Sequence, residues 1–237
     1  MIQATDLYSA IDGTWPAAEY RPLGPWMLRN GAGGGKRVSA ATANHAVTAA
    51  DIETAEAEMV AMGQDRLFML TDGQETLDAD LADRGYAVID PVQLYACPTA
   101  QLTDVPIPRV TAFAIWEPLA IMEEIWAAGG IGAARLAVMA RAKTKTGIFA
   151  RAKDKPAGVG FAAVHDGICV VHAVEVLEHQ RRQGVATWIM RRAAFWAAEQ
   201  GAHTLAVLCV KDNTPANTLY QRLGFAPVCD YHYRIKT

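Results

Sequence analysis

Long apolar segments, paired cysteines and secretion signals are absent from this 237-residue sequence. No apolar run approaches the ~18 residues that a membrane-spanning helix needs, so we expect no membrane partner. The four cysteines are widely spaced and form no C-x-x-C pair, which argues against a bound metal or a disulfide framework. The first residues lack a basic segment followed by an apolar one, so we expect a cytoplasmic protein with reduced thiols.

A nucleotide-binding loop is also missing, although a cluster of glycines at 31–35 suggests one. A Walker loop places four residues between its glycines and then Lys followed by Ser or Thr. Here the interval from Gly31 to Gly35 is one residue short, and Arg37 follows the lysine. The cluster therefore predicts a hairpin turn between strands at residues 26–29 and 36–39.

The sequence does contain enough apolar residues for a full core, and its charge is unevenly distributed. It is 51% hydrophobic and 20% charged, which is typical of a folded protein. Residues 1–104 carry 6 Lys+Arg and 15 Asp+Glu, or −9, whereas residues 105–237 carry 16 and 10, or +6, giving −3 in total. A basic half favours a polyanionic ligand. Because no aromatic residues interleave the basic ones, we expect no nucleic-acid partner.

The stretch from 170 to 187 predicts a strand, a short polar turn and a helix that begins at a glycine. Its β-branched residues up to Val176 suit a buried strand, and the apolar period becomes helical after Gly184. The first amides of a helix have no partner within the helix and lie at the positive end of its dipole. A glycine lets an anion approach them closely. With Arg181 and Arg182 beside it, the turn predicts a phosphate-binding cradle.

Two motifs in the second half then resemble the GCN5-related N-acetyltransferase (GNAT) family. Arg181-x-x-Gly184-x-Ala186 is similar to its pyrophosphate-binding motif, although alone it also suits an ordinary strand–turn–helix. About thirty residues downstream, the segment 213–225, with Leu-Tyr and Leu-Gly-Phe, resembles the family's other signature. The resemblance implies an α/β (α+β) fold over roughly residues 109–237, with a mixed, mostly antiparallel central sheet flanked by helices.

The resemblance also implies that acetyl-CoA is the cosubstrate. The backbone of the cradle would hold its pyrophosphate, and free backbone groups of the preceding strand would align its pantetheine arm. The implied cofactor-binding residues are Val174, Val176, Arg181, Arg182, Gln183, Gly184, Val185, Ala186 and Asn213. Asn213 is alternatively a helix cap.

Acetyl transfer from a thioester to an amine needs a neutral amine and benefits from a proton donor for the departing thiolate. Tyr220 matches the family's tyrosine that protonates the thiolate; the alternative is a packing aromatic. Glu175 and His172 are the candidate bases, and water or the substrate alone is the third option. Strict alternation along a strand predicts that Glu175 and His172 face opposite sides of the sheet.

A proline-rich segment at 97–108 predicts a linker between a domain at 1–104 and a domain at 105–237. The first half echoes the second at an offset of 139, with Arg84-Gly-Tyr86 falling on Leu223-Gly-Phe225. The same offset places His45 on Gly184 and Leu81 on Tyr220. The N-terminal half is therefore predicted to be a degenerate GNAT-like repeat, unless any strand–helix–Gly-aromatic unit gives this match.

The sequence thus predicts an N-acetyltransferase that moves an acetyl group from acetyl-CoA to a primary amine of a small molecule or protein. Two alternatives stay open: a non-catalytic acyl-CoA-binding or interaction protein, and the same fold using another acyl-CoA donor. The sequence is also compatible with a homodimer.

Overall fold

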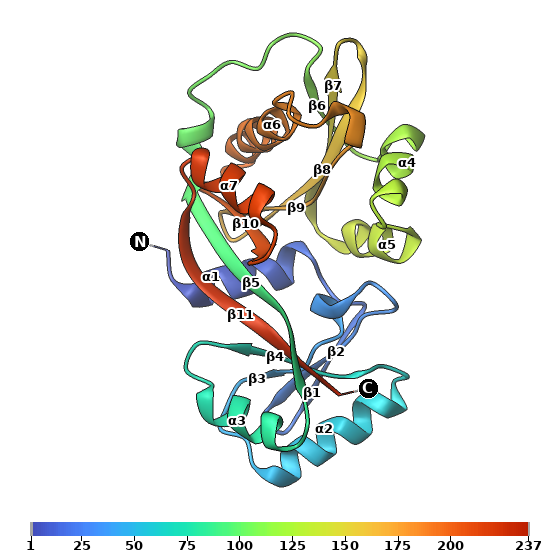
Figure 1. Cartoon of the computed structure of the whole chain (residues 1–237), viewed down its shortest axis with the longest axis vertical. Helices are drawn as coiled ribbons and strands as arrows, with labels where there is room; N and C mark the ends of the chain where they lie inside the picture. The colour runs from blue at the N-terminus through green and yellow to red at the C-terminus, as the bar shows by residue number, and fades with distance from the viewer. Residues whose placement is uncertain (1, 237) are drawn as a thin grey trace. The chain divides into compact units, whose positions relative to one another are not determined.

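The computed structural model describes residues 2–236 and divides them into two compact units (Figure 1). Unit 1 holds residues 2–16, 94–209 and 213–228, and unit 2 holds residues 17–93, 210–212 and 229–236. Within the described residues, no helix is both long enough and apolar enough to span a membrane.

Unit 1 is built on a sheet in which β6, β7, β8 and β9 are antiparallel neighbours and β9 pairs with β10 in parallel. Its elements are α1 (Ala4–Thr14), the end of β5 (Ala87–Pro98), β6 (Ala112–Ile115), α4 (Ala120–Ala128), α5 (Ala133–Arg141), β7 (Thr144–Ala152), β8 (Lys155–His165), β9 (Ile168–Val176), α6 (Val185–Glu199), β10 (Thr204–Val210), α7 (Thr214–Arg222) and the start of β11 (Ala226–Lys236). A mixed, mostly antiparallel sheet flanked by helices was predicted, and the structure confirms it.

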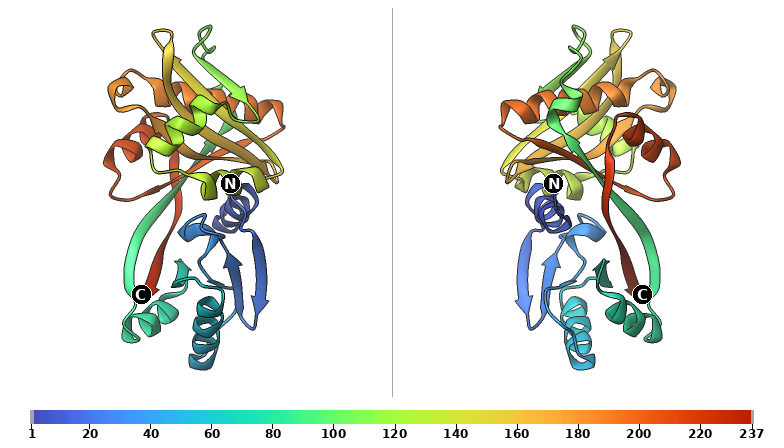
Figure 2. Two further views of the ribbon diagram at one scale, coloured as in Figure 1. Left: turned by 90° about the vertical axis from the view of Figure 1, so that its right-hand side faces the viewer. Right: turned by 90° about the vertical axis from the view of Figure 1, so that its left-hand side faces the viewer.

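Helix α6 covers one face of this sheet, and α1 and α4 pack on β8 and β9 from the other face (Figure 2). The α6 side is the centre of the core, where Ile189, Ala193 and Ala197 are fully buried. Glycine on β8 permits this close packing, because a Cβ on Gly160 would lie 2.7 Å from Cγ2 of Ile189. The helix is therefore pressed directly against strands that precede the predicted cradle.

Strand β9 contains a β-bulge that alters which side chains share a face. Ala173 has a positive φ of 51°, and the register with β8 shifts so that Phe161 pairs with His172 but Val159 pairs with Glu175. Phe161 and Val159 are two residues apart and face the same side, so His172 and Glu175 also face the same side. The prediction that they face opposite sides is wrong, because one extra residue interrupts the alternation.

Unit 2 contains a second, three-stranded sheet and its own core. Its elements are β1 (Glu19–Leu23), β2 (Trp26–Asn30), β3 (Thr42–Ala43), α2 (Ala49–Ala61), β4 (Arg66–Thr71), α3 (Glu75–Asp83), most of β5 and the end of β11. The sheet has the order β1-β2-β3, and β4 pairs with β11 in antiparallel. Trp26, Phe68 and Leu81 are buried in its core.

Local predictions failed at three places. The predicted partner of β2 at residues 36–39 is wrong, because 36–38 form a 3-10 helix and β2 pairs with β1 across a two-residue turn at Gly24. Strand β1 was missed because it is an exposed edge strand that tolerates Pro22. Strand β5 runs through Pro91 without interruption. The first part of the predicted linker ends β5 and then forms a 3-10 helix at Thr99–Leu102.

The element boundaries repeat at the offset found in the sequence. β4, α3 and β5 begin at residues 66, 75 and 87; adding 139 gives 205, 214 and 226, and β10, α7 and β11 begin at 204, 214 and 226. Gly85 and Gly224, also 139 apart, have φ values of 83° and 81°. These coincidences support an internal repeat, whereas the GNAT-like origin of the first half stays a prediction.

The last strand of each repeat, β5 or β11, begins in one unit and ends in the other. In unit 1 the end of β5 neighbours β10, and in unit 2 the end of β11 pairs with β4. Compactness therefore divides the chain differently from a cut after residue 104. The division into domains at 1–104 and 105–237 describes the two predicted repeats, and it stays a prediction.

Candidate functional site

The predicted cradle lies at the N-terminus of α6, after a 3-10 helix at Glu178–Gln180. Gly184 adopts a left-handed conformation with φ 78°, and Arg182 has φ 60°. Left-handed residues in such a turn direct successive backbone amides toward one point and form an anion-binding nest. The side of Gly184 is open, since an added Cβ would have Nε1 of Trp188, 4.0 Å away, as its nearest neighbour. The turn therefore fits a pyrophosphate.

Side chains around the cradle fall into two groups. Arg181, Arg182 and Gln183 are exposed, whereas Val185 is buried and anchors the helix in the core. Arg181 donates from Nε to the carbonyl oxygen of Val176 at 3.2 Å and so ties the turn to the end of β9. The structure thus brings residues 181–186 together, with Val185 contributing only its backbone to any ligand.

Strand β9 extends beyond the region in which it pairs with β10. The parallel register covers four residue pairs and ends at Val171 and Val207, whereas β9 continues to Val176. Val174 and Val176 pack their side chains against the α6 core. An extended ligand arm can add to such a strand edge through backbone hydrogen bonds. This arrangement fits a role for the backbone, not the side chains, of the two valines.

Tyr220 and Asn213 lie on and before α7. The side-chain oxygen of Asn213 accepts a hydrogen bond from the amide of Ala216 at 3.2 Å, so the helix-cap alternative is present in the structure. Tyr220 is buried, and its ring contacts those of Tyr95 and Phe225 at centroid distances of 6.2 and 5.9 Å. No hydrogen-bond partner of the Tyr220 hydroxyl is found within residues 2–236. The ring of Tyr220 therefore packs in the core, while its hydroxyl remains available for a ligand.

Burial raises the pKa of the Tyr220 phenol well above its ordinary value, and the neighbouring Cys209 adds to the rise. The phenol therefore keeps its proton throughout the physiological pH range. A donor of this kind suits a hydrogen bond to a developing thiolate, because complete proton transfer to a less basic sulfur would be uphill.

His172 and Glu175 lie on the same face of the sheet, but they differ in burial and in hydrogen bonding. Nε2 of His172 lies 2.9 Å from the Thr14 hydroxyl, which itself donates to the carbonyl oxygen of Ala10 at 2.6 Å. Nε2 must therefore carry the proton and donate. His172 is 5% exposed, and the centroid of its ring lies 5.0 Å from that of Trp15. His172 is a buried, hydrogen-bonded residue and is poorly placed to receive a proton from a substrate.

Glu175 is half-buried and lies against the end of α4. A Cβ on Gly129 would be 2.5 Å from the Glu175 carboxyl carbon, so only glycine fits there without displacing the carboxylate. Burial raises the pKa of Glu175, and the charges of Arg181 and Arg135 partly offset that rise. Of the two predicted bases, Glu175 therefore has the better position, and burial makes it a stronger base than an exposed glutamate.

Trp126 is a contributor that sequence reasoning missed. Its indole N–H donates to the carbonyl oxygen of Ala173 at 2.8 Å, and the side chain is fully buried. The bond holds the bulge residue that brings Glu175 to its face. Only the apolar helical period around α4 hinted at burial, and nothing in the sequence marked the polar contact.

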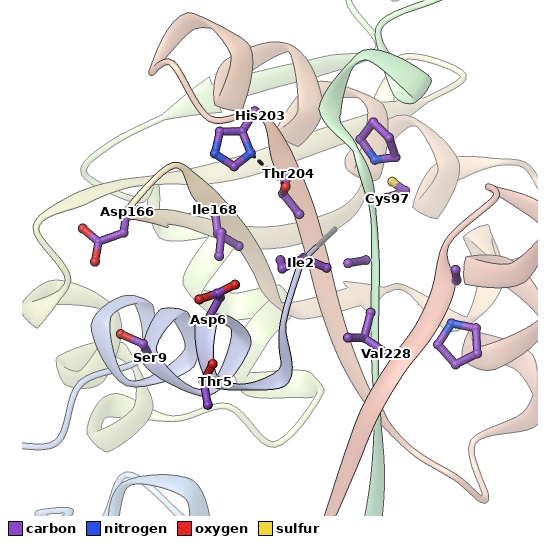
Figure 3. Close-up of a pocket in the computed structure, with 14 residues that line it drawn as sticks. Ile2, Thr5, Asp6, Ser9, Cys97, Asp166, Ile168, His203, Thr204 and Val228 are labelled. Atoms are coloured by element: carbon purple, nitrogen blue, oxygen red, sulfur yellow. Dashed lines mark hydrogen bonds between the residues drawn. The ribbon is translucent and has the colours of Figure 1, made fainter.

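Unit 1 also contains a hollow of about 990 Å³ that none of the predicted site residues lines (Figure 3). It lies at the starts of β9 and β10, whereas the cradle follows the end of β9. Separately, no group of three or more His, Cys, Asp or Glu that could hold a metal ion is found within the described residues.

Residues 114–225 match the acetyltransferase (GNAT) family, a segment that includes β9, the cradle and Tyr220. This segment is a GNAT domain. Members of the family are acyltransferases that use acyl-CoA. The chain is also similar to an uncharacterized N-acetyltransferase, YobR, of Bacillus subtilis (strain 168), with 28% identity over 242 residues and 94% of each sequence covered.

Solved GNAT structures share the fold at low sequence identity. A GCN5-related N-acetyltransferase from Kribbella flavida has a TM-score of 0.75 and 20% identity, covering 98% of this chain and 95% of its own. A tandem GNAT protein from the clavulanic acid biosynthesis pathway has a TM-score of 0.60 and 13% identity, covering 89% and 77%. The fold similarity therefore extends well beyond residues 114–225.

Proposed function

We propose that this GNAT protein is an N-acetyltransferase that moves an acetyl group from acetyl-CoA to a primary amine of a small molecule or protein. One arrangement carries the proposal: an open anion nest at Gly184 lies directly after a strand whose final residues include the half-buried Glu175. The binding site for the donor and the group that would accept the amine proton therefore belong to one strand–turn–helix unit.

The donor would be held mainly by backbone groups. The amides of residues 181–186 would face the pyrophosphate, with the helix dipole and the exposed Arg182 adding positive charge. The β9 backbone at Val174 and Val176 would align the pantetheine arm. Acetyl-CoA supplies the activated acetyl group, whose carbonyl carbon the amine attacks.

Two side chains would manage protons. Glu175 would take a proton from the incoming ammonium, directly or through water, because its raised pKa makes it a better base than an exposed glutamate. Tyr220 would donate a hydrogen bond toward the sulfur as the thioester bond breaks. His172 would hold the strand in place through Thr14.

The decisive experiment compares Tyr220→Phe with the unaltered protein on a broad panel of amines. Removing the hydroxyl keeps the packing ring, and hydrogen-bond donors to a developing negative charge contribute roughly 10²- to 10³-fold. We expect kcat to fall by about that range while the Kd for acetyl-CoA changes little. Tyr86→Phe, which removes a hydroxyl in unit 2, is the matched control.

Unaltered turnover in Tyr220→Phe would make Tyr220 a packing residue. If the unaltered protein binds acetyl-CoA but acetylates no amine, it is a binding module, and if it turns over only with longer donors, it is a different acyltransferase. Homodimer formation, cytoplasmic location and the lack of a nucleic-acid partner stay predictions from the sequence.

A further inference from the structure

The hollow in unit 1 is open to solvent and is bordered by α1 on one side and by strand ends on the other (Figure 3). Its volume of about 990 Å³ lies at the upper end of the range of small-molecule sites, which is roughly 300 to 1,000 Å³. Helix α1 lies outside residues 114–225, the segment that matches the family model. The lining residues are Ile2, Thr5, Asp6, Ser9, Ala96, Cys97, Pro98, Asp166, Ile168, His203, Thr204, Ala226, Pro227 and Val228.

The formal charge of this lining is negative when its histidine, His203, is counted as neutral. Asp6 and Asp166 are the carboxylates, and the lining contains no Lys or Arg. Asp6 accepts from the amide of Gln3 at 2.9 Å, and Asp166 lies 3.3 Å from Nε2 of His165. Each of these contacts uses one carboxylate oxygen. The hollow therefore attracts cations and disfavours phosphates and carboxylates.

The floor of the hollow is largely apolar. Ile168, Val228 and Cys97 contribute side chains there, and Thr204 adds a hydroxyl that lies 3.0 Å from Nδ1 of His203. Burial raises the pKa of the Cys97 thiol to about 12, so this group stays protonated and acts as an apolar surface. An apolar floor with carboxylates above it suits a molecule that combines a hydrocarbon body with a positive charge.

The hollow is physically connected to the proposed catalytic strand. Ile168 pairs with Thr204, and Ile168 lies four residues before His172 on the same face of β9. Helix α1, which lines the hollow with Thr5, ends at Thr14, which binds His172. A ligand in the hollow would therefore contact both the helix and the strand that hold His172.

We propose that this hollow is a binding site for a small organic ammonium ion with an apolar body. Binding of the ammonium ion does not depend on the proposed function; only its expected effect on acetyl transfer rests on that function. An ammonium ion of this kind has two sources, a second charged group of the acceptor amine or a separate effector. In both cases the ligand combines a positive charge with an apolar body, which is what the lining favours.

The binding test uses benzyltrimethylammonium, which is permanently charged, carries an aromatic body and has no N–H to acetylate. Ligand-observed NMR on the full chain measures its Kd and that of benzoate, an anion of similar size. We expect the cation to bind more tightly than benzoate. The variant carrying both Asp6→Asn and Asp166→Asn should bind the cation roughly 2- to 20-fold more weakly, because both carboxylates are exposed and exposed ion pairs contribute at most a few-fold each.

Controls separate loss of charge from loss of fold. Asp166 has φ 46°, which asparagine tolerates, so Asp166→Asn alone keeps the turn intact if Asp6→Asn weakens the cap of α1. Asp154→Asn removes an exposed carboxylate of unit 1 outside the lining and should leave the Kd unchanged. Benzoate binding as tightly as the cation, or equal cation affinity in the double variant and Asp154→Asn, would overturn the proposal.

Kinetics then distinguish the two sources. With an amine that the protein acetylates, competition of the cation against the amine assigns the hollow to the acceptor. A change in kcat at saturating amine assigns it to a separate effector. If no amine is acetylated, the proposed function fails, while the NMR measurement still decides whether the hollow binds the cation.

Discussion

Trp126 donates its indole N–H to the carbonyl oxygen of Ala173, and the two atoms lie 2.8 Å apart. Ala173 is the bulge residue with positive φ, so this one hydrogen bond connects α4 to the β-bulge in β9. The bulge decides that Glu175 points to the face occupied by α1 and α4. A fully buried tryptophan thus acts on the site through the backbone.

Trp126→Phe keeps the buried ring but leaves the Ala173 carbonyl without this donor. We expect a loss of roughly 1–3 kcal/mol in the free energy of unfolding, because an unsatisfied buried acceptor costs that much. We also expect kcat to fall by about 10- to 100-fold as Glu175 is displaced, with little change in the Kd for acetyl-CoA.

Trp26→Phe provides a matched control for this change. Trp26 is also buried and donates from Nε1 to a carbonyl oxygen, that of Asp51, at 3.0 Å in unit 2. It should lose similar stability while retaining kcat. Equal kcat values for the two variants would show that Trp126 has only a structural role.

Glu175→Gln should alter the pH dependence of the reaction. Because burial raises the pKa of Glu175, the acid limb of kcat/KM should lie above pH 4.5, the ordinary value for glutamate. The glutamine variant should lose this limb and about 10²- to 10⁴-fold in rate. The exposed Glu178, changed to Gln, is the control. An acid limb that survives in Glu175→Gln would assign the base to water or the substrate.

Gly184→Glu should abolish acetyl-CoA binding in calorimetry. The new side chain would place a negative charge at the anion nest and strain a residue with φ 78°. Gly201→Glu introduces the same charge at φ 77° near the other end of α6, so it controls for strain and should bind normally. Undiminished binding by Gly184→Glu would place the cradle elsewhere. Stoichiometry in the unaltered protein should be near one per chain.

Asp78→Asn should lower stability in a pH-dependent way. Arg234 donates two hydrogen bonds to Asp78, at 2.7 and 2.9 Å, and His232 lies 2.8 Å from the same carboxylate. These contacts, led by the Arg234 hydrogen bond, lower the pKa of Asp78 from 3.8 to about 2. A folded pKa below the unfolded one stabilises the protein above about pH 4, and this stabilisation is lost as pH falls toward 2.

Thermal unfolding at several pH values tests this expectation. Because the group is partly exposed, we expect Asp78→Asn to cost about 1–2 kcal/mol at pH 7 and little near pH 2. Asp80→Asn, on the exposed side of the same helix, should show no such pH dependence. A constant difference from pH 7 to pH 2 would contradict the assignment.

The sequence alone determined the features that depend on neighbours along the chain. The Arg181-x-x-Gly184-x-Ala186 spacing located the cradle, since a left-handed glycine before a helix is a local requirement. The helical period after Gly184 located α6, and the offset of 139 placed two sets of elements in register. Short-range sterics and apolar periodicity suffice for such features.

Only the tertiary structure decided which segments meet. The sequence carried no signal for the bulge at Ala173, because the buried Trp126 that holds it lies about 47 residues away. It also misassigned the partner of β2, since strand pairing depends on an exposed edge that composition does not mark. Contacts between distant residues also decide that β5 ends in unit 1 and β11 ends in unit 2. They likewise bury His172 against Thr14 and form the hollow beside α1. Periodicity says which face of a segment is apolar, but not what will cover it.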